Sequence, residues 1–154
     1  MRILVISPND AFRQPAQAAC LRFTESLVSL RLADSLGQGL ELAHQFEAEV
    51  VIVDLTRNVE AGLIAIGDLA AAKMTRLVVA SIDKSTTDLM TRAIRAGAGE
   101  FIAQPPQEDE IHAVLRKAQR MLSPVEMPEN RRGRIVVAFS SKGGVGKTTL
   151  TCNL

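Results

Sequence analysis

The sequence has little cysteine and histidine, the residues that most often build disulfides and transition-metal sites. It contains two cysteines, Cys20 and Cys152, far apart in the chain. Isolated thiols are typical of a reduced protein, so we expect neither a disulfide nor a cysteine metal site. The two histidines, His44 and His112, lie in helical patterns without a second ligand four residues on, and we interpret them as ordinary helix residues.

Strong net charge and long apolar runs are also missing. The formal net charge is +1, so there is no electrostatic reason to expect nucleic acid or an anionic membrane as a partner. The apolar runs have the length of strands, which excludes a transmembrane segment. The start, MRILVIS, is interpreted as a first strand and not as a signal peptide. These features together predict a cytoplasmic protein.

Short apolar runs rich in valine and isoleucine recur along the first part of the chain. Continuous runs of this kind favour parallel strands that are covered on both faces. One run alternates between apolar and polar residues, which favours a strand nearer the edge. The expected strands are residues 2–7, 28–33 (the alternating run), 50–54, 77–81 and 100–103.

Helical patterns lie between these runs and follow the last one. One helix is expected between Ser85, a candidate N-cap, and Gly97, a natural C-cap. The resulting order of five strand–helix units predicts an α/β fold, a doubly wound five-stranded parallel sheet of the flavodoxin-like kind. The stripes are Phe12, Ala16, Ala19, Phe23 and Leu27; the less regular Leu36, Leu40, Ala43 and Glu47; Leu89, Ala93 and Ile94; and Ile111, Val114, Leu115 and Ala118.

The composition changes after residue 122. The stretch SPVEMPENRRGR combines prolines, polar residues and a basic run, which is typical of a linker. We therefore expect a first domain over residues 1–122, a linker over 123–133, and the start of a second domain over 134–154. Residues 134–139, RIVVAF, are expected to form a strand that lies against a sheet edge or an apolar face.

The first domain resembles a response-regulator receiver (CheY-like) at three stretches. VVIVDLT places Asp54 at the position of the phospho-accepting aspartate, and LVVAS places Ser81 at the receiver hydroxyl. AGAGEFIAQPP places Phe101 at the aromatic switch position and Gln104 at the position of the receiver lysine. The resemblance covers residues 1–122 and implies the receiver fold.

Two departures from the receiver pattern concern its chemistry. Receivers carry two acidic residues after the first strand that hold Mg²⁺, and here Ser7 and Pro8 stand there. Asp10 lies further along and would contribute a carboxylate only after a shift of the loop. Gln104 donates a hydrogen bond but carries no charge. We therefore expect a pseudo-receiver in which Asp54 is not stably phosphorylated; a phosphorylatable receiver in a two-component phosphorelay remains the alternative.

The tail SKGGVGKTT resembles the deviant phosphate-binding loop of MinD/ParA ATPases. The resemblance implies that the glycines wrap phosphates with backbone N–H groups, that Lys147 reaches the β- and γ-phosphates, that Thr148 binds Mg²⁺, and that Lys142 crosses to a dimer partner. The implied nucleotide-binding residues are Lys142, Gly143, Gly144, Gly146, Lys147, Thr148 and Thr149. The sequence stops at Leu154, so we expect a truncated first element of an ATPase domain with no hydrolysis of its own.

A receiver-like domain joined to a MinD/ParA-type ATPase resembles the CpaE/TadZ proteins of Flp/Tad pilus assembly and polar localisation. The resemblance implies ATP and Mg²⁺ as cofactors of the full-length protein, with none expected in this chain. It also implies homodimer or pilus partners, for which residues 86–118 are the expected surface, and recruitment to the cell pole or the inner membrane face. A ParA-type partitioning ATPase is the remaining alternative, which the near-neutral charge disfavours.

Overall fold

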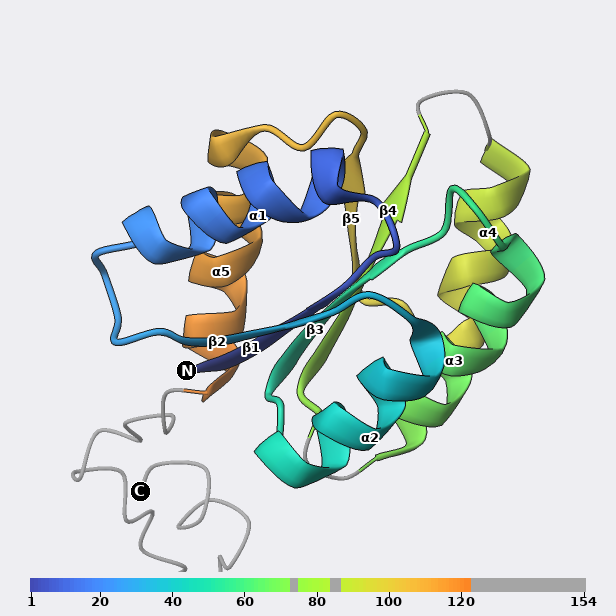
Figure 1. Ribbon diagram of the computed structural model, residues 1–154, viewed down its shortest axis with the longest axis horizontal. Coiled ribbons are helices and arrows are strands. Elements are labelled where there is room, and N and C mark those ends of the chain that lie inside the picture. The colour runs from blue at the N-terminus through green and yellow to red at the C-terminus, as the bar shows by residue number, and fades with distance from the viewer. Residues whose placement is uncertain (73–74, 84–86, 123–154) are drawn as a thin grey trace, which may run out of the picture. The chain divides into compact units, whose positions relative to one another are not determined.

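The computed structural model describes residues 1–72, 75–83 and 87–122, and these residues form five alternating strands and helices. The elements are β1 (Arg2–Ile6), α1 (Asp10–Arg22), β2 (Ser29–Ala33), α2 (Leu36–Phe46), β3 (Val50–Asp54), α3 (Val59–Ala71), β4 (Leu77–Ile82), α4 (Thr87–Ala96), β5 (Glu100–Ala103) and α5 (Glu108–Leu122). The predicted α/β order is confirmed (Figure 1).

The sheet is parallel throughout and has the strand order β2-β1-β3-β4-β5. Helices α1 and α5 cover one face, and α2, α3 and α4 cover the other (Figure 1). Every residue of β3 and β4 is buried, because these inner strands turn alternate side chains into two separate cores. This double burial is the physical reason why their sequences are continuous apolar runs.

The first helix is shorter than its apolar stripe predicts. It ends at Arg22, and Phe23 is its C-cap with an extended backbone. Phe23 remains in the core at 4% exposure, but Leu27 is 93% exposed and lies outside the helix, so its place in the stripe was wrong. The chain has already turned toward β2 at that point, where the N-terminal amine donates to the Leu27 carbonyl at 2.8 Å.

The other predicted helix ends have different outcomes. Gly97 follows α4 with a φ of +113°, and its N–H bonds the Ile94 carbonyl at 2.9 Å, so the predicted C-cap is confirmed. Glu47 is not part of α2 but its left-handed C-cap, with a φ of 50°. Ser85, the candidate N-cap, lies outside the described residues.

Three helices begin with a capping side chain next to the carboxyl end of a strand. The carbonyl oxygen of the Asn9 side chain accepts from the Ala11 N–H at 3.0 Å, and Asn58 accepts in the same way from Ala61 at 3.2 Å. Ser35 caps α2 through the N–H of Gln38. Such caps satisfy N–H groups that the first helical turn leaves free. They fix the loops that surround the carboxyl edge of the sheet.

Candidate functional site

The candidate site lies at the carboxyl edge of the sheet, where β1 and β3 are neighbours. Chain connections leave these two strands for opposite sides of the sheet, which is where open α/β sheets form their binding crevice. Asp54 is the last residue of β3 and is 5% exposed. Ser7 follows β1, and Ser81 pairs with Asp54 in the β3–β4 register; both serines are fully buried. The sequence therefore placed these residues at the correct edge.

Both oxygens of the Asp54 carboxylate accept hydrogen bonds. The Ser7 hydroxyl donates to Oδ2 at 2.6 Å. Gln104 Nε2 donates to Oδ1 at 2.7 Å. The backbone N–H and the hydroxyl of Thr56 donate to the same Oδ1 at 2.9 and 2.7 Å. A buried carboxylate needs such donors to compensate for lost water, and here they come from the ends of β1 and β5 and from the loop after β3.

Thr56 belongs to the site although its sequence position was not singled out. Its contact with Asp54 is a local turn in which an aspartate side chain binds the N–H two residues on. The spacing of an aspartate and a threonine around one leucine is the signal that would have found it. A hydroxyl at that position adds the second donor.

Ser7 is itself held in place from the helix that follows it. Its hydroxyl accepts from the Asn9 N–H at 3.0 Å, and its carbonyl accepts from Arg13 Nη1 at 2.7 Å. Arg13 also forms an ion pair with Asp10. The Asp10 carboxylate, on α1, is 74% exposed and already has Arg13 as its partner.

The residues at this edge do not fit the Mg²⁺ site that the receiver fold implies. Mg²⁺ requires near-octahedral oxygen ligation, usually including carboxylates and waters. Ser7 donates to Asp54 Oδ2 in place of supplying a second carboxylate, and Pro8 has no side-chain oxygen. Within residues 1–72, 75–83 and 87–122 there is no group of three or more His, Cys, Asp or Glu that could hold a metal.

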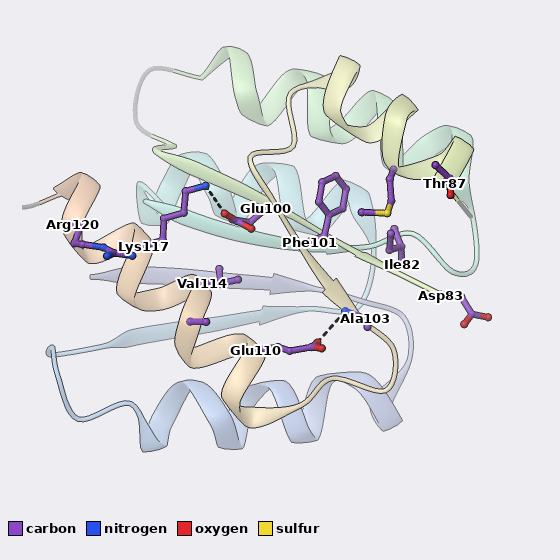
Figure 2. Close-up of a pocket in the computed structure, with 12 residues that line it drawn as sticks. Ile82, Asp83, Thr87, Glu100, Phe101, Ala103, Glu110, Val114, Lys117 and Arg120 are labelled. Atoms are coloured by element: carbon purple, nitrogen blue, oxygen red, sulfur yellow. Dashed lines mark hydrogen bonds and ion pairs between the residues drawn. The ribbon is translucent and has the colours of Figure 1, made fainter. Parts of the chain in front are cut away.

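Ser81 and Phe101 are not among the described residues that donate a hydrogen bond to the Asp54 carboxylate. The Ser81 hydroxyl is buried and has no partner in the described part of the chain. Phe101 is half-buried on β5 and packs against the core under α2, α3 and α4. It also lines a hollow of about 600 Å³ between α4, β5 and α5 (Figure 2).

This hollow is the centre of the surface expected for partners, and we call it the α4–β5–α5 face. Apolar side chains contribute to its lining, with charged groups around them. In Figure 2, Phe101 projects from β5 toward α4, while Lys117 and Arg120 come from α5. Its lining residues are Ile82, Asp83, Thr87, Met90, Glu100, Phe101, Ala103, Glu110, Ala113, Val114, Lys117 and Arg120.

Several charged side chains of the expected partner surface, residues 86–118, are paired within the chain. Arg92 binds Glu60 of α3, and this hydrogen bond raises the pKa of the guanidinium. Lys117 binds Glu100 on β5. Glu108 and Arg116 of α5 pair with Arg22 and Glu25, at 2.9 and 3.3 Å. The packing of neighbouring elements, which a one-dimensional pattern does not contain, accounts for these pairs.

No protein-family model matches the sequence. The chain is 24% identical over 146 residues to the cell cycle transcriptional regulator CtrA of Caulobacter vibrioides. That match covers 92% of this chain and 60% of CtrA, so the chain spans about 60% of the length of its curated relative.

Solved structures give the fold. The receiver domain of a DNA-binding response regulator from Colwellia psychrerythraea 34H superposes with a TM-score of 0.69 at 17% identity, over 78% of this chain and 98% of that one. The chain has the receiver fold. The receiver domain of NtrX from Brucella abortus gives a TM-score of 0.66 at 21% identity, over 77% and 98% of the two chains. At such identities the likeness to the receivers establishes the fold alone.

The predicted nucleotide-binding loop lies outside the described residues. This applies to Lys142, Gly143, Gly144, Gly146, Lys147, Thr148 and Thr149, to the linker over 123–133, and to the strand expected over 134–139. ATP and Mg²⁺ binding therefore remain predictions. In the part of the chain with described structure, no helix is long and apolar enough to cross a bilayer.

Proposed function

We propose that residues 1–122 form a pseudo-receiver, a receiver-type module that acts through protein contacts and not through phosphoryl transfer to Asp54. The observation that carries the proposal is the set of donors on Asp54. Ser7 binds one carboxylate oxygen, while Gln104 and Thr56 bind the other. No acidic neighbour and no cationic side chain is among these groups.

The chemistry of phosphoryl transfer supports this proposal. An attacking carboxylate oxygen must approach the phosphorus in line with the leaving group, and cations must neutralise the charge on the transferring group. Here the Ser7 hydroxyl and the Gln104 amide both donate to the nucleophile, and the amide brings no charge. Reaction at Asp54 would need these bonds to break without the electrostatic gain that a lysine and Mg²⁺ supply.

A phosphorylatable receiver is the second candidate, and the comparisons favour it. Asp54 lies at the end of β3, where it is the register partner of the buried Ser81 on β4. The similar proteins carry names of response regulators and of a transcriptional regulator. For this candidate, the donors on Asp54 would be a resting arrangement that opens during phosphorylation.

Incubation with acetyl phosphate and Mg²⁺, followed by intact-mass measurement, separates the two candidates. The pseudo-receiver is expected to gain no phosphoryl group. The variant Ser7→Asp/Pro8→Asp/Gln104→Lys restores the groups that the receiver resemblance implies and serves as a test of the conditions. A phosphoryl group on the unmodified sequence that disappears in Asp54→Asn would establish the second candidate.

We further propose a second copy of this chain as the occupant of the α4–β5–α5 face. Helix α5 has three acids in its first turn and Arg120 in its last turn, so it runs past the hollow with charges of opposite sign at its two ends. Two copies related by a two-fold axis perpendicular to α5 would place the acidic end of one α5 near the basic end of the other. The apolar side chains that line the hollow supply the surface that the second copy would cover.

The wider setting that we propose is a CpaE/TadZ-type protein, in which this module regulates or positions a MinD/ParA-like ATPase. What supports it is the motif KGGVGKTT over residues 142–149, preceded by an apolar run. Binding of a fluorescent ATP analogue to a chain extended beyond Leu154, and its loss in Lys147→Ala, is the test. If the extended chain binds no nucleotide, the proposed link to a MinD/ParA-like ATPase is wrong.

A further inference from the structure

Gln104 connects the carboxyl ends of two strands that are not neighbours. In the sheet, β4 lies between β3 and β5. Gln104 follows β5, and its side-chain amide crosses to Asp54 at the end of β3, at 2.7 Å. The intervening strand β4 presents Ser81, whose buried hydroxyl has no partner among the described residues. The bridge over β4 is therefore made by the glutamine and not by the residue closest in the register.

The backbone around Gln104 links this bridge to the α4–β5–α5 face. The Gln104 N–H donates to the Ile82 carbonyl of β4 at 3.1 Å. One residue earlier, the Ala103 N–H donates to the Glu110 carboxylate of α5 at 3.2 Å (Figure 2). Ile82, Ala103 and Glu110 all line the hollow. A change in the position of Gln104 would thus reach the lining of the hollow through one or two hydrogen bonds.

We propose that Gln104 is a built-in latch: its hydrogen bond to Asp54 holds the carboxyl end of β5, and with it the α4–β5–α5 face, in one arrangement that needs neither metal nor phosphate. This inference rests on the pseudo-receiver function and adds how the module stays in one state. A carboxamide does not titrate in the physiological range, so its donor is always present. Asp54 is 5% exposed, so water competes poorly for the same oxygen.

Amide hydrogen exchange and methyl NMR on residues 1–154 test the latch in the variant Gln104→Leu, which keeps the bulk of the side chain and removes the donor. Removal of a hydrogen bond to a buried carboxylate is expected to speed exchange at the amides of residues 103 and 104 by about tenfold or more. The Met90 methyl resonance, on the far side of the hollow, is expected to shift. The matched control is Gln107→Leu, because Gln107 is an exposed neighbour whose side-chain amide donates to the Pro105 carbonyl at 3.3 Å and not to Asp54.

Rescue separates a latch from a merely structural position. The variant Gln104→Lys restores a donor with a different shape and is expected to return both readouts to the values of the parent chain. Gln104→Asn shortens the side chain by one methylene, keeps the site polar, and is expected to behave like Gln104→Leu, so it replaces that variant if the leucine prevents folding. The latch is wrong if the variants at 104 and 107 give the same exchange and the same Met90 resonance, or if Gln104→Lys behaves like Gln104→Leu. The phosphorylation test is separate: a phosphorylated parent chain would refute the pseudo-receiver function, whereas the exchange and resonance results test the contact between Gln104 and Asp54.

Discussion

At the scale of single residues, the site is defined by what surrounds Asp54. The sequence could place Asp54, Ser81 and Gln104 at one edge, because the carboxyl ends of parallel strands meet there. It could not predict that Ser7 and Gln104 bind different oxygens of the same carboxylate, since this depends on side-chain positions in the folded chain. The same replacements that remove charge from a receiver site here supply neutral donors. Ser7 and Gln104 therefore both bring uncharged donors to the Asp54 carboxylate.

Cys20 gives a pH-dependent prediction. Its side chain is fully buried on α1, and burial raises the pKa of the thiol from 9.0 to about 12. Between these values the unfolded chain ionises while the folded chain keeps its proton. The contribution of the protonated Cys20 thiol to the stability of the folded chain is thus complete below pH 9 and is lost as pH rises toward 12. The free energy of unfolding is expected to fall by up to about 1.4 kcal/mol per pH unit in that window from this group.

The measurement is urea denaturation at several pH values between 8 and 11, with Cys20→Ala as the comparison. Both chains carry Cys152→Ser, so that Cys20 alone differs. The alanine variant is less stable at neutral pH because a buried side chain is shortened, but its stability should fall less steeply above pH 9. Parallel slopes for the two chains would mean that the thiol is not protected by burial.

At the scale of helices and strands, the sequence predicted most of the fold. The inner strands were recognised because both of their faces are buried, and Gly97 because a helix end with positive φ favours glycine. The end of α1 was missed because Leu27 continues the helical stripe beyond a backbone that has already left the helix. Periodicity reports the spacing of apolar residues but not the point at which a chain must turn toward its next strand.

Gly97 allows a sharp test at this scale. Its φ of +113° is unfavourable for any L side chain, and a Cβ there would lie 2.5 Å from the Cβ of Ala70. Gly97→Ala is therefore expected to reduce the free energy of unfolding by more than about 1 kcal/mol. The control is Gly37→Ala on α2, where a Cβ meets nothing within 4 Å, and which is expected to stabilise by about 0.5–1 kcal/mol. Urea denaturation measures the free energy of unfolding of both variants. Equal changes in the two would show that a side chain at residue 97 does not strain the α4–β5 turn.

At the scale of the whole molecule, a receiver fold is combined with a site in which the Asp54 carboxylate is bound by the uncharged side chains of Ser7 and Gln104. A fold can host different functions, so the fold does not decide between a signalling input and a contact surface. The surface charges of α4 and α5 indicate what kind of contact the α4–β5–α5 face could make. Arg92, Lys117 and Arg116 are partnered within the chain, so the proposed association would rely more on the apolar lining than on these groups. Exposed ion pairs contribute little in any case.

Met90 tests whether a second copy uses the α4–β5–α5 face. Its side chain is 39% exposed on α4 and lines the hollow, so Met90→Asp places a charge in the proposed contact. A buried, unpaired carboxylate is strongly unfavourable, and self-association measured by sedimentation velocity is expected to weaken by at least about tenfold. The matched control is Ile64→Asp, which makes a similar exchange of an apolar residue for a charge on α3, at a side chain that is 67% exposed and outside the hollow. Circular dichroism should show that both variants keep the helical content of the parent chain. If the control weakens association as much as Met90→Asp, or if neither does, the copies meet elsewhere or not at all, and the α4–β5–α5 face has a different partner.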